Sequence, residues 1–415
     1  HICNQEKRVM QNLPLPMKFY GTTNNLNFEN VKNKNAYKSF AVCEKCLNRI
    51  LTGMKYTENN FRDYLFDLSV FLVPANIDPS SFKSRLFKSI IKLLKTRKSE
   101  YKTEIGKIRK ILRKSKRKDI KFNLLFYYHP QGSQQFDILK LISNIELESL
   151  LTKMILFDQY VQKYGLDMLT YKSYFNLYDL RNNLFPSWFS QNKQPDYNVF
   201  GKDLLNFLEQ FLINGKLSYY DLIKKFIRIN KKRTNQKKPD NLAAFKINLF
   251  LSILTKLQQL RTGGKMQKGK YLSEISKKEY NDFFETHSDI YEKNGFRQGL
   301  FLLGTIISKI KYAQKEKTSN FLKKMNLDGI PPRRIPGLIN QVRDFSEIYK
   351  KKKDIYIESG IWGNIMDRLQ GIQNSKMKPD EVVFYILSGI SYEDYLGYKY
   401  SADKKLNQKN QEGGE

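Results

Sequence analysis

The sequence has few of the residues from which proteins build disulfide frameworks, membrane spans and metal-dependent active sites. Of its 415 residues, three are cysteine and three are histidine. Three cysteines cannot form the disulfide framework of a small secreted protein. No apolar run approaches the roughly 18 residues that would span a membrane, and the longest candidates are Leu68–Pro74 and Gly299–Ile307. Because no export signal is visible, we expect a cytoplasmic protein that makes no contact with a membrane.

Acidic residues are also scarce. The chain holds 73 Lys and Arg against 41 Asp and Glu, which gives a formal net charge of +32. Hydrophobic residues make up 40%, which is too many for a disordered chain. A chain this basic repels itself unless a polyanion or an acidic partner neutralises it. The excess favours nucleic acid as the partner, and the alternative is a basic protein held in an acidic complex.

The length predicts two to three domains, at roughly 150 residues for each. The chain begins His1-Ile2-Cys3 without a methionine, so we interpret it as a fragment that lacks its true N-terminus. We expect an α+β fold: a mixed N-terminal half with a zinc-ribbon-like cysteine insertion at 1–60 and an α+β body at 61–200. An all-α C-terminal helical bundle follows at 201–400, and then a disordered tail at 401–415.

Two patterns define the body at 61–200. Apolar and basic residues alternate at helical spacing over Lys83–Lys121, which predicts a basic amphipathic helix or helix pair broken near Gly106. Strand-forming residues then fill Phe122–Tyr128 and resume at Phe136–Lys140, which predicts a hairpin.

Apolar stripes at helical spacing recur throughout 201–400, and short connections between such stripes are typical of an antiparallel bundle. The last stripe begins at Pro379, where a first helical turn accepts proline. It is predicted to end at Gly389. The polar residues that follow predict a frayed tail.

The basic stretch Lys83–Lys121 is the leading candidate for contact with nucleic acid. It holds 17 Lys or Arg against three acids, whereas a merely solvated helix face would carry more acids in i,i+4 pairs. We therefore expect its cations to contact phosphates. The candidates there are Lys107, Arg109, Lys110, Arg113, Lys114, Lys116, Arg117 and Lys118. Second-rank candidates are the basic loop Lys231, Lys232 and Arg233 and the bundle-face residues Arg297, Lys309, Arg333 and Arg334.

The cysteines predict a structural zinc site. Cys43-Glu44-Lys45-Cys46 is a C-x-x-C motif, and two thiolates at this spacing can bind one Zn²⁺ while a second pair of ligands arrives from elsewhere. Cys3 is a third candidate ligand, and His1 or a cysteine preceding it is a possible fourth. The alternatives are a redox pair, two buried thiols, or a site that has lost its metal.

No catalytic constellation is visible, so we expect a protein that is not an enzyme. The run Gly264–Lys270 resembles the start of a phosphate-binding loop, but Tyr271 stands where a Mg²⁺-binding Ser or Thr is required. We interpret His129 as a turn residue and His287 as a surface or capping residue. Neither lies in a carboxylate pattern typical of metal-dependent nucleases.

Several stretches together resemble the large subunit of the type I-B CRISPR-associated Cascade complex, the Csh family, with its N-terminal region missing. Their order along the chain matches the family's cysteine-bearing insertion, central body and C-terminal helical region. The stretches are Lys18–Tyr20 and Asn35–Phe40 leading to Cys43–Cys46, then Leu72–Pro74 with Phe122–Tyr128 and Phe136–Ile142, and last Phe296–Gly304, Tyr312–Gln314 and Glu381–Ile390. Cys3 fits the second position of the family's upstream cysteine pair.

The resemblance implies a non-catalytic subunit of a crRNA-guided surveillance complex in prokaryotic antiviral defence. It would recognise the protospacer-adjacent motif (PAM) and stabilise the R-loop. Its partners would be crRNA, target double-stranded DNA, a recruited helicase-nuclease and other Cascade subunits (backbone, crRNA 5′-end-binding and small subunits). Some family members also make a small subunit from an internal start. Met266 is a candidate here, which would make about 266–400 the part that resembles a small subunit.

Two other functions fit parts of the sequence. One is a nuclease or nucleotide-dependent enzyme of a mobile element, which would cleave nucleic acid in a metal-dependent way. The other is a structural scaffold whose basic surface contacts only protein, and whose assembly RNase would not disturb.

Overall fold

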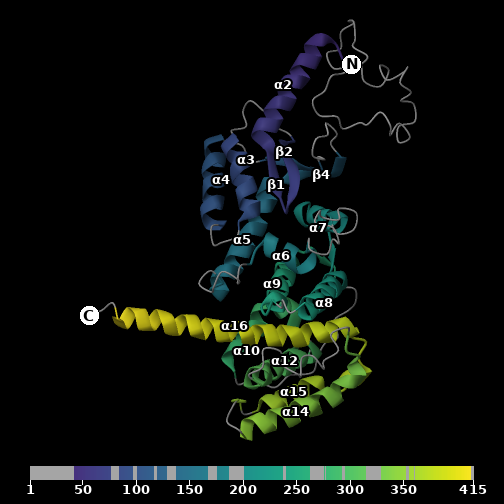
Figure 1. The fold of residues 1–415 in the computed structure, drawn as a ribbon, viewed down its shortest axis with the longest axis vertical. Helices are drawn as coiled ribbons and strands as arrows, with labels where there is room; N and C mark the ends of the chain where they lie inside the picture. The colour runs from purple at the N-terminus through teal and green to yellow at the C-terminus, as the bar shows by residue number, and fades with distance from the viewer. Residues whose placement is uncertain are drawn as a thin grey trace. The chain divides into compact units, whose positions relative to one another are not determined.

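The structure, a computed structural model, describes residues 42–75, 84–96, 101–115, 119–128, 137–166, 175–186, 201–236, 240–261, 275, 277–291, 295–314, 329–351, 355–358 and 360–412. Within this part the chain forms two compact units (Figure 1), one ending at Ile155 and the other beginning at Leu156. The sequence placed a domain boundary at 200 instead, because its helical stripes became regular only after that point.

The first unit is a four-stranded sheet with helices. Its strands β1 (Arg62–Leu65), β2 (Leu68–Pro74), β3 (Lys121–Tyr128) and β4 (Asp137–Glu146) form an antiparallel meander in the order β1-β2-β3-β4. The tight β1–β2 connection places Phe66 at φ 55° and Asp67 at φ 65°, as a two-residue type I′ hairpin requires. The β3–β4 pairing confirms the predicted hairpin, although its turn and His129 lie outside the described residues.

Helix α2 (Glu44–Phe61) belongs to this same unit. Its Met54 packs against Phe71 of β2 and Tyr127 of β3, whose rings stack with centroids 4.7 Å apart. The described part of 1–60 is therefore built onto the sheet, and a separate zinc-ribbon-like insertion is not seen in it. Helices α3 (Ser84–Lys95) and α4 (Tyr101–Ser115) and the start of α5 (Leu147–Tyr164) complete the unit.

The second unit is helical, as the sequence predicts. Two short strands, β5 (Leu217–Ser218) and β6 (Leu260–Arg261), form a small parallel pair that an all-α bundle would lack. The other elements, in chain order, are α6 (Leu177–Leu184), α7 (Lys202–Leu212), α8 (Tyr219–Asn235), α9 (Ala243–Lys256), α10 (Lys278–Thr286), α11 (Ser288–Tyr291), α12 (Gly295–Ala313), η6 (Pro332–Arg334), α14 (Ile335–Lys351), α15 (Ile361–Leu369), η7 (Ile372–Asn374) and α16 (Pro379–Glu412).

Helix α9 lies at the centre of this unit. Every residue from Ala243 to Leu254 is buried, as expected for a helix that is apolar on all sides. Its polar residues have partners: Asn248 donates to the Ser388 hydroxyl at 2.7 Å and accepts from the Tyr291 hydroxyl at 2.9 Å. These bonds join α9 to α16 and α11.

Helices α12 and α16 pack very closely because glycines face each other at the contact. A Cβ atom on Gly389 would collide with the carbonyl oxygen of Phe301, and one on Gly304 would collide with that of Ile386. Gly389 was predicted to end the last helix. The structure shows that prediction wrong, since the missing side chain serves helix packing and α16 continues through it.

The same helix extends to Glu412, through most of the region for which we predicted a disordered tail. The residues after Tyr400 lack an apolar stripe but contain good helix formers, among them Ala402, Lys404 and Gln408. Polarity was therefore a poor guide to where this helix ends.

Candidate nucleic-acid interface

Helices α3 and α4 form an amphipathic pair. On α3 the buried side carries Leu86, Ile90 and Leu93, and on α4 it carries Ile105 and Ile108 along with Leu112. The predicted break near Gly106 is wrong: α3 ends at Lys95, α4 begins at Tyr101, and Gly106 lies inside α4 with no atom near its missing side chain. The apolar stripes dictate this arrangement, because each stripe needs a core to cover it.

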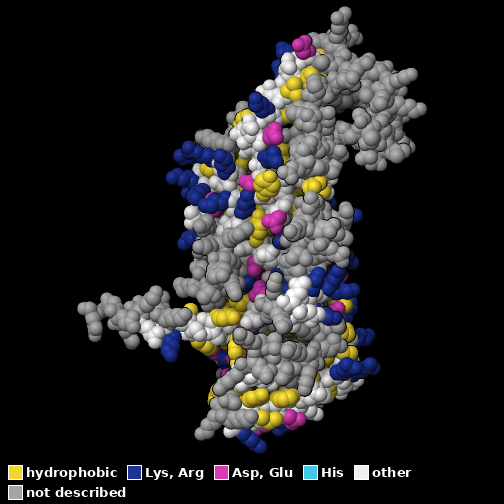
Figure 2. Space-filling model, in the orientation of Figure 1, with side chains coloured by type: hydrophobic (Ala, Val, Ile, Leu, Met, Phe, Trp, Pro, Cys, Tyr) yellow, Lys and Arg dark blue, Asp and Glu magenta, His cyan; other side chains and the backbone are white. Residues whose placement is uncertain are grey.

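The opposite side of the pair is almost entirely basic, and we call it the α3–α4 surface. Figure 2 shows Lys and Arg gathered over these two helices. It is defined by the exposed residues Arg85, Lys88, Lys92, Lys102, Lys107, Arg109, Lys110, Arg113 and Lys114. Of the leading candidates from the sequence, Lys107, Arg109, Lys110, Arg113 and Lys114 thus lie on this surface, and Lys116, Arg117 and Lys118 fall outside the described residues.

One carboxylate joins the two helices. Glu104 is 1% exposed, and its Oε1 lies 2.8 Å from Nζ of both Lys92 on α3 and Lys107 on α4. Burial opposes ionisation of this carboxyl, but the hydrogen bonds from Lys107 and Lys92 outweigh burial and hold the pKa of Glu104 below its usual value. Glu104 is therefore a carboxylate at neutral pH, and it neutralises cations from beneath the surface.

For the remaining cations of the α3–α4 surface, the described residues provide no acidic partner. None of them forms an ion pair within the described part of the chain, and Glu104 is the only acid in α3 or α4. Unpaired cations packed this closely repel each other, and an anionic ligand relieves that repulsion. Arg85, Lys88, Lys92 and Lys102 also lie on this surface; they belong to the predicted basic stretch Lys83–Lys121, although they were not among its individually named candidates.

The second-rank basic triplet lies in helix α8 and not in a loop. Arg233 is mostly buried and donates to Asn183 and to the carbonyl oxygen of Asn182 at 2.7 Å, and it lies 3.9 Å from Asp240. Lys231 and Lys232 are half-buried, and each has an interaction of its own. Arg233 is therefore engaged within the protein, in the α6–α8 contact.

Arg297 lies in the protein core and not on an open bundle face. It is 8% exposed, and its guanidinium lies over the rings of Tyr219 and Tyr385 at 5.1 and 5.2 Å. It also donates to the carbonyl oxygen of Ile290 at 2.8 Å and lies 3.8 Å from Glu381. Since the structure already surrounds this cation, we remove Arg297 from the candidate phosphate contacts.

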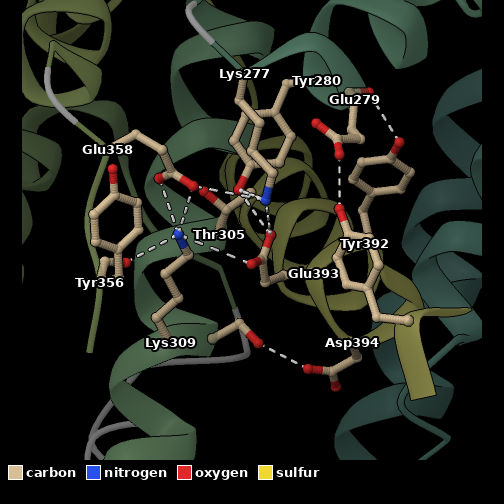
Figure 3. Close-up of polar contacts among 12 residues, drawn as sticks. Lys277, Glu279, Tyr280, Thr305, Lys309, Tyr356, Glu358, Tyr392, Glu393 and Asp394 are labelled. Carbon is tan, nitrogen blue, oxygen red and sulfur yellow. Dashed lines mark hydrogen bonds and ion pairs between the residues drawn. The ribbon is translucent and has the colours of Figure 1, made fainter. Parts of the chain in front are cut away.

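Lys309 is likewise occupied, in a network of charged residues within the second unit (Figure 3). Its Nζ lies 2.9 and 3.0 Å from the two oxygens of Glu358 and 4.0 Å from Glu393. Lys277 bridges the same two carboxylates at 3.7 and 3.6 Å, and the Tyr280 hydroxyl donates to Glu393 at 2.7 Å. The charges of two cations and two anions balance in this network, which joins separate segments of the second unit. Because Lys309 is paired within the protein, we remove it from the candidate phosphate contacts.

Arg333 and Arg334 are exposed, in η6. The segment they belong to lies beside the start of α16, where the Ile330 amide donates to the carbonyl oxygen of Pro379 at 3.2 Å. The η6 segment also contacts η7, and the exposed Lys376 and Lys378 lie between η7 and the start of α16. The sequence separates these residues by more than forty positions and carries no signal of their meeting.

The C-x-x-C motif straddles the start of a helix. Cys43 is the N-cap of α2, and Cys46 lies in its first turn. Both thiols are buried in an apolar cluster with Val42 and Leu47. Among the described residues no group of three or more His, Cys, Asp or Glu could hold a metal ion. Cys3 and His1 lie outside the described residues, so these residues fit half of a zinc site, and zinc stays a prediction.

His287 is fully buried, contrary to the prediction of a surface residue, although it does cap α10. Its Nε2 lies 2.7 Å from the Tyr164 hydroxyl, and its Nδ1 lies 2.5 Å from that of Ser252. Burial lowers the pKa of His287 from 6.5 to about 3. The ring is therefore neutral at pH 7 and holds α5, α9 and α10 together.

The fold and surface define a class: a basic protein with a mixed sheet-and-helix first unit that presents an accessible cationic helix pair, and with a helical second unit. In the part of the chain that the structure describes, no helix is both long and apolar enough to cross a membrane. Comparison with protein families then gives the family. Residues 1–145 match the central domain, and residues 175–404 the C-terminal domain, of CRISPR-associated protein TM1802.

Together the two matches cover most of the 415 residues, so the chain belongs to the CRISPR-associated TM1802 family. Membership supports a role in CRISPR defence. The gap between the matches, 146–174, contains the boundary between the two units. No curated protein matches the chain.

Proposed function

We propose that this chain is the non-catalytic large subunit of a type I-B Cascade complex, and that it binds target DNA during PAM recognition and R-loop formation. Family membership supports a CRISPR role. The observation that carries the DNA-binding part is the α3–α4 surface, where nine exposed cations lie on two packed helices that contain a single acid, Glu104.

The physical requirement for such a subunit is modest. Exchanging a DNA duplex for a guide–target duplex and a displaced strand is nearly balanced in free energy, so contacts to DNA phosphates can tip it. Contacts to phosphates need cations that are exposed to solvent, and they do not depend on the base sequence. The α3–α4 surface meets this requirement. The arginine pair at 333 and 334, with Lys376 and Lys378, offers a smaller second contact.

The proposed partners are crRNA, target double-stranded DNA, the backbone, crRNA 5′-end-binding and small subunits, and a recruited helicase-nuclease. Coexpression of the full-length gene product with its genomic neighbours, followed by affinity purification and sequencing of bound RNA, tests this assignment. We expect repeat-spacer RNA and several copies of a backbone subunit. RNA-free protein, or protein carrying random RNA, would contradict the proposal.

The small-subunit start at Met266 remains a proposal as well, and the structure adds a condition to it. Helices α12 and α16 pack on each other, but α16 also covers α9, where the Phe245 amide donates to the Ser391 hydroxyl at 3.1 Å. A product starting at 266 would lack α9 and expose this apolar side. We therefore expect such a product to stay bound to other subunits, which copurification of a short C-terminal product would show.

A further inference from the structure

We propose that the α3–α4 surface holds the paired phosphate backbones of a nucleic-acid duplex, independent of sequence, and does not hold a single strand. This inference rests on the proposed function and specifies the ligand of its main surface. It follows from where the cations lie on the two helices and from which other side chains the same surface lacks.

The cations of α4 form two rows. At 3.6 residues per turn, Lys102, Arg109 and Arg113 follow one line along the helix, and Lys107, Lys110 and Lys114 follow a second line about a third of a turn away. With a rise of about 1.5 Å per residue, each row is roughly 10–16 Å long. Both rows are exposed along their length.

Helix α3 adds a third row, formed by Arg85, Lys88 and Lys92. Because Lys92 and Lys107 bind the same Glu104 oxygen, the α3 row lies beside the second row of α4. Axes of packed helices lie about 8–10 Å apart. The outer rows are therefore separated by at least about that distance, which is comparable to the roughly 6–12 Å widths of the DNA grooves. Cations in parallel rows at this spacing can reach phosphates of two strands that flank one groove.

The surface lacks the exposed aromatic rings that single-strand binding uses, and it lacks the amide side chains that read adenine. Proteins that hold single strands stack bases on exposed aromatic rings, but the one aromatic residue of α4, Tyr101, is 2% exposed, and Phe87 of α3 is also 2% exposed. Reading bases in the major groove relies on paired contacts from amide side chains or from arginine, and we assign the three arginines of this surface to phosphates because they lie in the same rows as its lysines. Neither helix contains Asn or Gln, and the only small polar side chain described as exposed on them is Thr103.

Glu104 favours the same ligand. By holding Lys92 and Lys107 at 2.8 Å it fixes the relative position of the α3 row and the nearer α4 row. A duplex has a fixed groove width, so rows that are held in place suit it. A flexible single strand can adapt to one row alone and gains nothing from their spacing.

The test is binding of the full-length chain to labelled probes by fluorescence anisotropy at several salt concentrations. The probes are two DNA duplexes of unrelated sequence, an RNA–DNA duplex, and one single strand. The variant Lys88→Glu/Lys110→Glu/Arg113→Glu removes one cation from each row. The control Arg343→Glu/Lys350→Glu/Lys351→Glu makes the same charge change at exposed positions of α14.

We expect the α3–α4 variant to bind both DNA duplexes at least about tenfold more weakly at physiological salt. The slope of log K against log salt should shrink by about 2.7, at about 0.9 for each of the three phosphates that the variant no longer neutralises. The affinity of the α3–α4 variant for the single strand, and the affinity of the control variant for every probe, should change less than about twofold. An equal weakening of RNA–DNA duplex binding identifies the shared duplex backbone as the ligand. If only the two DNA duplexes or only the RNA–DNA duplex bind more weakly, that kind of duplex is the ligand of the surface.

Several results would overturn the inference. Equal loss of affinity for the single strand, discrimination between the two DNA sequences, or equal loss in the control would show that the surface does not recognise a duplex backbone. Unchanged duplex binding would make an acidic protein the better partner for this surface. These failures are distinct from failure of the proposed function, because repeat-spacer RNA and backbone subunits would still copurify with the α3–α4 variant.

Discussion

Replacing Gly389 by alanine provides the sharpest test of how the second unit is built. Alanine within an exposed helix normally stabilises a protein by about 0.5–1 kcal/mol relative to glycine, because glycine loses more conformational entropy on folding. At Gly389 the new methyl group would overlap the carbonyl oxygen and carbon of Phe301 and approach the amide nitrogen of Thr305. These are backbone atoms of α12, so no side-chain rotation can relieve the overlap.

The two helices must therefore separate, and overpacking of this kind costs about 1–3 kcal/mol. Gly397 is the matched control, because it lies eight residues further along α16 with no atom within 4 Å of the added methyl group. We expect Gly389→Ala to lower the thermal midpoint by several degrees and Gly397→Ala to raise it slightly, at about 2–4 °C for each kcal/mol. Equal effects of the two substitutions would refute close packing of α12 on α16.

Two buried groups and the cysteine pair give further tests. Below about pH 6.5 the unfolded chain binds a proton at His287 that the neutral, buried ring does not, so acid lowers the free energy of unfolding of the wild type down to about pH 3. His287→Gln should remove this contribution. Denaturant titrations should show the wild type losing up to about 1.4 kcal/mol of unfolding free energy per pH unit more than the variant. Lys246→Met should lower the unfolding free energy by about 3 kcal/mol, because Lys246 is 0% exposed and lies 3.0 Å from Asp179, and adding Asp179→Asn should recover part of that loss. For the predicted zinc site, elemental analysis should find about one zinc ion per chain in the wild type and much less in the Cys43→Ser variant. An unchanged zinc content in that variant would mean that Cys43 is not a ligand.

The sequence predicted local features well where one pattern determined them. The hairpin of β3 and β4 followed from runs of strand-forming residues, and the buried sides of α3 and α4 followed from apolar spacing. In each case the side chains that decide the structure are neighbours in the sequence. The same holds for the cations of α4, whose exposure follows directly from the position of the apolar stripe on the opposite side.

Features that depend on contacts between distant segments could not be predicted. Gly389 looked like a helix end because nothing near it in the sequence reveals that α12 passes close by. Arg297 and Lys309 looked like surface cations, since the tyrosines and carboxylates that surround them come from segments distant in the sequence. His287 was interpreted as a surface or capping residue, and its burial could not be foreseen because its partners Tyr164 and Ser252 lie far away in the chain.

The central claim is that this chain binds target DNA within an RNA-guided complex. It is tested most directly by reconstituting the complex with and without the chain and measuring the affinity for a DNA duplex that matches the guide. We expect tight binding with strand opening when the chain is present, and at least about a hundredfold weaker binding without it, equivalent to about 2.7 kcal/mol or more. Equal affinity and equal strand opening in both complexes would contradict it.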